Sequence, residues 1–183
     1  MDTMNTDRTL MRQVVHRDER AFALLVERYG GRMLAVARRL LGSQADAEDA
    51  VQRAFLRCYL GAAGYRVEWA VSTWLYRILT NVCIDEMRRR RSRSTGSEAL
   101  TRETAAAANG RGDSIDAVAR LDVRRALRRV PREARILVTL RYVDGLSYGE
   151  LARIRGISVN TVKSQLARAR SILRGALGGG KGR

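Results

Sequence analysis

The chain has 183 residues, 45% of them apolar, which is enough for one ordinary domain or two small ones with buried cores. Its 35 Lys and Arg residues outnumber 19 Asp and Glu residues, and the formal net charge of +16 favours a polyanionic partner. No run approaches the length of an apolar membrane span and the first residues lack a secretory signal pattern, so we expect a cytoplasmic protein without membrane insertion.

Helical periodicity runs through both ends of the chain. Apolar residues recur at three- and four-residue steps, strand-like alternation is scarce, and Pro131 is the single proline. We therefore predict an all-α fold of two small helical domains joined by a flexible linker, with a helix-turn-helix in the second domain.

The first domain is predicted to span residues 1–91. The stretch from Asp18 to Gly42 is typical of one long amphipathic helix or of two stacked pieces, because Gly30 and Gly31 each weaken a helix interior by about 1 kcal/mol relative to Ala. Gly42 is expected to end this helix.

Two further helices are expected in this domain. One starts near Asp46, where three acidic residues can cap backbone amides and complement the helix dipole. The other, STWLYRILTNVCIDEMRRRR, has a basic end and an inward apolar stripe. The stripe consists of Trp74, Leu75, Ile78, Val82 and Met87.

The cysteines, Cys58 and Cys83, lie in these two helical patterns and are far apart in sequence. No CxxC motif is present, and His16 is the single imidazole, so we expect no metal site and no cofactor. Small buried thiols are the favoured interpretation, and a redox-sensing pair is the alternative that the sequence leaves open.

Residues 92–113 are predicted to form the linker, because they are rich in Ser, Thr, Gly and Ala and have no apolar periodicity. The excess of basic over acidic residues is +5 before this segment, zero within it and +11 in residues 114–183. The charge is thus concentrated in the second domain, although the base composition of the source genome can also raise the total Arg content.

The second domain is predicted to span residues 114–183. It begins with two helices, the second opened by Pro131 in its first turn and stopped by Gly145. Ser147 and Glu150 have capping-box spacing at the start of the next helix, and Ser158 can cap the last one.

A compact turn links these last two helices. Gly156 can adopt a positive φ, and Ala152 is small enough for a close crossing. Ile157, Val162 and Leu166 supply apolar contacts between the helices. Together these features predict a helix-turn-helix.

The outer face of the last helix combines cations with short hydrogen-bonding groups, which suit phosphates and base edges. Helix pairs with a glycine turn also occur in proteins that never bind DNA, and solvated faces usually carry charge. The local excess of +11 favours DNA binding. These outer residues are Asn160, Thr161, Lys163, Ser164 and Arg168.

In this order the segments resemble the extracytoplasmic-function class of bacterial sigma factors, which direct RNA polymerase to promoters. The resemblance is carried by DAEDAVQRAFLR and TWLYRILTNVCIDEMRRRR in the first domain, and by VPREARILVTLRYVDGLSYGELARIRGISVNTVKSQLARAR in the second. It covers nearly the whole chain outside the linker and the termini.

The resemblance implies three sets of site residues. Those for the clamp coiled coil in the largest subunit of core RNA polymerase are Asp46, Glu48, Asp49 and Gln52. Those for the −10 element are Trp69, which would stack on a flipped base, with Ser72, Thr73, Arg77, Asn81, Asp85, Arg88 and Arg89. Those for the −35 element are Ser158, Asn160, Thr161, Lys163, Ser164 and Arg168. Other core surfaces, promoter DNA and an anti-sigma factor are the further partners that it implies.

Helical spacing alone also places Arg77, Asn81 and Asp85 on one face of their helix, and indicates that Trp74 packs in the core rather than on DNA.

Two other classes of function fit parts of the sequence. A helix-turn-helix repressor or activator would need a dimerisation element, and none is recognisable. A DNA-processing enzyme would need a nucleophile or a carboxylate cluster for metal, and the dense acids near Asp46 fit a helix start better. We therefore expect an initiation factor without enzyme activity or a small-molecule substrate.

Overall fold

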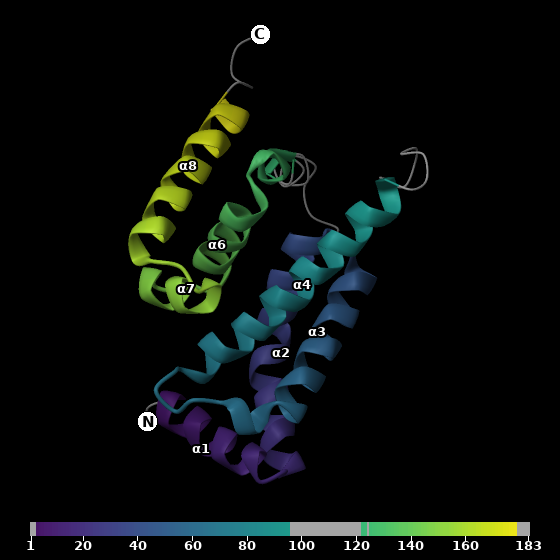
Figure 1. Ribbon diagram of the computed structural model, residues 1–183, viewed down its shortest axis with the longest axis vertical. Helices are drawn as coiled ribbons and strands as arrows, with labels where there is room; N and C mark the ends of the chain where they lie inside the picture. The colour runs from purple at the N-terminus through teal and green to yellow at the C-terminus, as the bar shows by residue number, and fades with distance from the viewer. Residues whose placement is uncertain (1–2, 96–121, 124, 179–183) are drawn as a thin grey trace, which may run out of the picture. The chain divides into compact units, whose positions relative to one another are not determined.

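The structure is a computed structural model that describes residues 3–95, 122, 123 and 125–178 (Figure 1). These residues form helices and turns and no β-strand, so the all-α prediction is confirmed. The chain divides into two compact units, Met1–Leu100 and Thr101–Arg183. Residues 96–113 of the expected linker lie outside the described residues.

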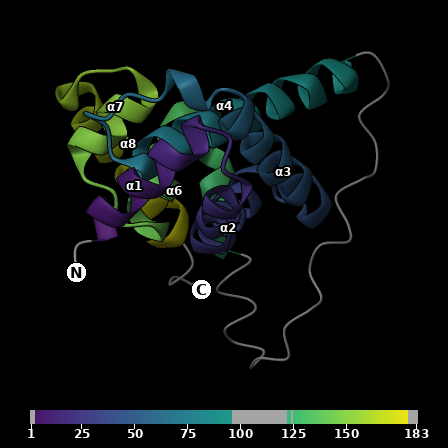
Figure 2. The same cartoon turned by 90° about the horizontal axis from the view of Figure 1, so that it is seen from below.

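The first unit is a bundle of four helices and one 3-10 turn. They are α1 (Thr3–Val15), α2 (Glu19–Leu41), α3 (Gln44–Leu60), η1 (Ala62–Gly64) and α4 (Val71–Thr95). Helices α2, α3 and α4 pack pairwise, and α1 packs on α2 and α4 (Figures 1 and 2). Helix α4 continues four residues past the predicted domain end at residue 91, and α1 was not predicted at all.

Helix α2 is a single helix, which decides between the two alternatives left by the sequence. The Asp18 carboxylate caps it by accepting from the Ala21 amide at 3.0 Å. It passes through Gly30 and Gly31 without interruption and ends at Gly42, whose φ of 76° closes the helix in the left-handed conformation.

Helix α1 is tied to α2 by a buried carboxylate. Asp7 accepts hydrogen bonds from Arg28 and from the Tyr29 hydroxyl. Burial is the main cause of a raised pKa at Tyr29, and the hydrogen bond to Asp7 raises that pKa further. The hydroxyl therefore keeps its proton and remains a donor at neutral pH. This polar contact adds to apolar packing, since Leu10, Met11 and Val14 of α1 are also buried.

Helix α3 begins two residues earlier than expected, at Gln44. Its N-cap is Ser43, which accepts from the Asp46 amide at 3.4 Å, so the acidic residues do not supply the cap. Only Asp46 lies in the first turn, where a carboxylate complements the helix dipole.

Helix α4 is buried on more than one side. Of the predicted stripe, Trp74, Leu75 and Val82 are buried, whereas Ile78 and Met87 are half-buried. The sequence stripe missed several further core positions because α1, α2 and α3 all pack on this helix. These positions are Val71, Tyr76, Leu79, Cys83 and Ile84.

The second unit contains α6 (Arg132–Val143), α7 (Tyr148–Arg155) and α8 (Val159–Gly178), preceded by helical residues 125–129. Helices α6, α7 and α8 all pack on one another around a mainly aliphatic centre, which also includes the buried Thr139. Pro131 stands at the N-cap of α6, one residue before the helix, and Gly145 follows its C-cap with φ 70°. The central residues include Ile136, Leu137, Leu140, Leu151, Ile154 and Leu166.

We predict opposite effects of the same substitution at two glycines of the first unit. A Cβ added at either Gly31 or Gly42 would meet nothing within 4 Å. Gly31→Ala should raise the free energy of unfolding by about 0.5–1 kcal/mol through helix propensity. Gly42→Ala should lower it by about 1 kcal/mol, because φ is 76° there.

Guanidinium unfolding followed by tryptophan fluorescence measures this difference, since both tryptophans, Trp69 and Trp74, belong to the first unit. Equal effects of the two substitutions would contradict the role assigned to Gly42.

Candidate functional site

The turn between α7 and α8 has the geometry of a helix-turn-helix. Ser147 and Glu150 form the predicted capping box: Glu150 N–H donates to Ser147 Oγ at 3.2 Å, and Ser147 N–H donates to Glu150 Oε2 at 2.7 Å. Gly156 has φ 66°, as predicted, and the next amide, of Ile157, donates to Ala152 O at 3.1 Å.

Packing fixes the angle between these helices. Val162 and Leu166 of α8 and Ala152 of α7 are all buried. Arg155 also anchors α7 to α6, since its Nη2 and Nε lie 2.6 and 3.2 Å from Glu133 Oε2. Helix α8 is therefore held in place by its packing on α6 and α7.

The six residues predicted for the −35 element divide into two groups. Ser158 and Thr161 hold the start of α8: the Thr161 amide donates to Ser158 Oγ at 3.0 Å, and the two hydroxyl oxygens are 2.8 Å apart. The residues of the outer group are exposed, although Ser164 Oγ also donates to Thr161 O at 3.0 Å. The outer group is Asn160, Lys163, Ser164 and Arg168.

In the first unit, the loop after α3 and the first turns of α4 enclose a surface hollow of about 470 Å³. Trp69 comes from the loop, and Arg77 and Asn81 come from α4, so the structure brings three predicted −10 residues together. The lining consists of Gly64, Arg66, Trp69, Trp74, Arg77, Ile78 and Asn81.

Two tryptophans have different roles at this hollow. Trp69 is half-buried, and the Arg77 guanidinium lies 5.0 Å from the centre of its ring, a cation–π contact. Trp74 is buried and meets the Tyr65 ring edge-on at 5.6 Å, so the prediction that it packs in the core is confirmed. Trp69 is thus the less buried of the two tryptophans that line the hollow.

Other predicted −10 residues lie away from the hollow. Thr73 is fully buried and has no surface to offer DNA, while Ser72 is half-buried. Asp85 pairs with Arg57 of α3 at 3.7 Å instead of continuing the surface of Arg77 and Asn81. Arg88 and Arg89 are both exposed near the end of α4.

The predicted polymerase-binding residues lie along the first half of α3, and most of them have partners within the chain. Asp46 pairs with Arg90 of α4, and Asp49 pairs with Arg53 at 2.9 Å. Glu48 accepts from Gln44, and Gln52 is exposed. The structure therefore gathers these side chains on one helix, where the surface is less anionic than the sequence suggests.

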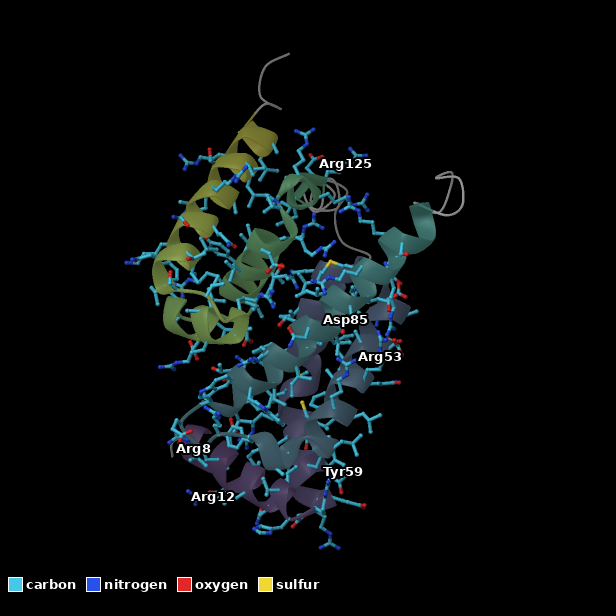
Figure 3. The ribbon with its side chains drawn as sticks, viewed as in Figure 1. Arg8, Arg12, Arg53, Tyr59, Asp85 and Arg125 are labelled. Carbon is cyan, nitrogen blue, oxygen red and sulfur yellow. The ribbon has the colours of Figure 1, made fainter. Side chains whose placement is uncertain are left out.

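Sequence reasoning missed the centre of this charge network, Glu86. Its buried carboxylate lies on α4 and faces three cations: Arg53 at 3.3 Å, Arg90 at 3.6 Å and Arg89 at 3.9 Å. Arg90 also donates to Leu41 O at 3.1 Å, which links α2 to the same cluster. Figure 3 labels Arg53, one member of the cluster. The available signal was the spacing of Glu86 and Arg90, one helical turn apart.

Both cysteines are buried and unpaired by disulfides. Burial raises the pKa of Cys58 to about 12 and that of Cys83 to about 12, with a smaller opposing effect of Arg53 on Cys83. Because the thiolate is the reactive form, these environments favour inert packing thiols over redox sensing. Among the described residues, no group of three His, Cys, Asp or Glu side chains could hold a metal ion.

Crossing a bilayer needs a long apolar helix, and the described part of the chain contains none.

Two family profiles match the two units. Residues 25–93 match Sigma-70 region 2, and residues 120–173 match Sigma-70, region 4. The chain is 34% identical over 174 residues to the ECF RNA polymerase sigma factor SigW of Bacillus subtilis (strain 168), covering 90% of this chain and 92% of that protein. It belongs to the ECF class of RNA polymerase sigma factors.

Other sigma factors extend the comparison. The ECF RNA polymerase sigma-E factor of Escherichia coli (strain K12) is 33% identical over 182 residues, covering 94% of this chain and 95% of that protein. The solved structure of CnrH in complex with the cytosolic domain of CnrY matches with a TM-score of 0.74 and 26% identity, over 96% of this chain and 99% of that one.

The solved complex of the sigma factor RpoE with the anti-sigma factor NepR from Bartonella quintana matches with a TM-score of 0.72 and 26% identity. The match covers 85% of this chain and 96% of that chain.

This sigma factor acts in promoter-specific transcription initiation. Sigma factors are regulatory subunits rather than catalysts, in keeping with surfaces built for binding.

We predict that the thiols of this sigma factor resist alkylation while it is folded. At pH 8, a rise in pKa from 9.0 to about 12 lowers the thiolate fraction about 1000-fold. Labelling with iodoacetamide should therefore be at least about 100-fold slower in the folded chain than in 6 M guanidinium, with both sites becoming reactive together on unfolding. Rapid labelling of either thiol in the folded chain would contradict this prediction and support the redox-sensing alternative.

Proposed function

We propose that this sigma factor joins core RNA polymerase through α3, reads the −35 element with α8, and captures an unpaired −10 base in the hollow beside Trp69. The observation that carries the proposal is the helix-turn-helix, whose last helix exposes cations and hydrogen-bonding groups on the side opposite its buried residues. The other two surfaces, on α3 and beside Trp69, belong to the first unit of the chain, which packs separately from the helix-turn-helix.

The −35 role is supported by the chemistry of the exposed side chains of α8. Lys163 and Arg168 can bond to the acceptor edge of guanine or to phosphate, and Asn160 can bond to adenine or to the backbone. Ser158 and Thr161 have a different part in this proposal, since they fix the N-terminal turn of α8. They would act by orienting the helix, and the exposed residues would act by contact.

The −10 role is supported by the combination of an aromatic face and cations at one hollow. A base stacked on an aromatic side chain gains about 1–3 kcal/mol, and nearby guanidinium groups compensate the phosphates of a single strand. Asn81 adds an amide that can bond to a base edge. Thr73 is left out of this surface, because its side chain is fully buried.

The core-polymerase role is supported by the position of four polar residues on one exposed stretch of α3. Their ion pairs with Arg53 and Arg90 lie at the surface, where such pairs contribute little and exchange readily. Basic groups on a partner can therefore compete for Asp46 and Asp49. We propose that the clamp coiled coil of the largest polymerase subunit is that partner, and that an anti-sigma factor covers the same face.

Run-off transcription tests the whole proposal. The full chain, bacterial core polymerase and fragmented genomic DNA should give specific transcripts whose start sites share two upstream elements. Core polymerase alone is the control. The absence of any transcript dependent on this chain would contradict the proposal.

Substitutions in α8 test the assignment of the −35 surface. Lys163→Ala and Arg168→Ala should each reduce discrimination at a −35 base by about 1–3 kcal/mol while leaving core binding unchanged. Competition between templates with altered −35 bases measures the first quantity, and co-purification with core polymerase measures the second. Arg153→Ala, an exposed cation on α7, is the matched control. Unchanged base preference would remove Lys163 or Arg168 from the site.

A further inference from the structure

The loop that carries Trp69 is ordered by a series of short hydrogen bonds. After α3, Gly64 N–H donates to Gly61 O at 2.9 Å, and Tyr65 N–H donates to Ala62 O at 3.0 Å. A turn then brings Trp69 N–H to Arg66 O at 3.0 Å. These backbone bonds shape each half of the loop, but none of them joins one half to the other.

The Tyr65 side chain makes that connection. Its hydroxyl donates to the main-chain oxygen of Trp69 at 2.7 Å, which closes the loop across four residues. Its ring stands edge-on to Trp74, so the side chain is fixed at both ends. The carbonyl that accepts this bond belongs to the residue whose ring faces the hollow.

Helix α1 contributes to the same contact. The positive charge of Arg8 lowers the pKa of Tyr65, but burial is the larger effect and raises it (Figure 3 labels Arg8 on α1). The hydroxyl therefore keeps its proton at neutral pH and remains the donor to Trp69. Helix α1 also packs on η1, directly before Tyr65.

One face of the Trp69 ring is already occupied in the structure. The Arg77 guanidinium lies over it, 5.0 Å from the ring centre, so a base that stacks on that face has to displace the cation. A base can replace Arg77 on the Trp69 ring only if the ring stays in place while Arg77 moves away. If the loop moved together with Arg77, the ring would be out of position for the base.

We propose that Tyr65 is a positioning residue, which holds the main chain at Trp69 so that its ring keeps the orientation needed to select an unpaired base. This inference rests on the proposed −10 role of Trp69. Tyr65 itself would not touch DNA.

The test uses holoenzyme made from the full chain and core polymerase. The promoter templates are prepared with the two strands already unpaired through the −10 element. Each base of that element is varied in turn, to find the position at which the holoenzyme has the strongest base preference. Tyr65→Phe, which keeps the ring against Trp74 and removes the donor, should reduce discrimination at that position about 3- to 10-fold. Discrimination at the −35 element should be unchanged.

Tyr59→Phe is the matched control, because it removes a hydroxyl that lies 3.5 Å from Arg17 O and away from the hollow. It should leave the preference at both elements as in the unmodified chain. Amide hydrogen exchange adds an independent measurement: exchange in residues 66–70 should be faster in Tyr65→Phe and unchanged in Tyr59→Phe.

Trp69→Ala separates failure of this inference from failure of the proposed function. If Trp69→Ala abolishes the base preference and Tyr65→Phe does not alter it, the positioning role is overturned and the −10 role of the loop stands. If Trp69→Ala has no effect, both are overturned. A uniform loss on all templates in Tyr65→Phe, with a lower melting temperature, would also overturn the inference, because it would indicate general destabilisation.

Discussion

A buried carboxylate between two helices holds the first unit in one arrangement. Glu86 faces Arg53 of α3 together with Arg89 and Arg90 of its own helix. The buried side of α3 combines small residues, Ala47, Ala50 and Ala54, which allow close approach, with the larger Val51 and Phe55. Charged contacts across this interface add to the preference for a single register, because a shift would leave a buried charge without its partner.

That register links two surfaces with different tasks. Helix α4 carries Arg77 and Asn81 at the hollow near its start, and Arg90 near its end, where it pairs with Asp46. A displacement of α3 relative to α4 would therefore change both the acids proposed to face the polymerase and the surface proposed for the −10 element. The network also explains why the acids of α3 are only partly available, since the cations that fix the register neutralise them.

Local signals were predictable from the sequence, and long-range ones were not. The helix-turn-helix follows from neighbours in the chain: a capping box, a glycine with positive φ and apolar spacing, each of which acts within one or two turns. Helix α1 was missed although Leu10, Met11 and Val14 have helical spacing and are buried, and its polar anchor, Asp7, depends on the distant Arg28 and Tyr29. The family resemblance placed Thr73 in the DNA site, but its side chain is buried, because α4 is packed on several sides and offers little free surface.

The energetics of strand opening assign the Trp69 loop a limited task. Opening roughly ten base pairs at about 1.4 kcal/mol of stacking per step costs on the order of 14 kcal/mol. Stacking of one captured base returns about 1–3 kcal/mol, so the hollow cannot supply that cost, and most of it has to come from the rest of the initiation complex. A contribution of that size is nevertheless enough to favour one base over another by tenfold or more. Selection depends on a fixed geometry rather than on total binding energy, and a loop closed by a side-chain hydrogen bond is suited to selection.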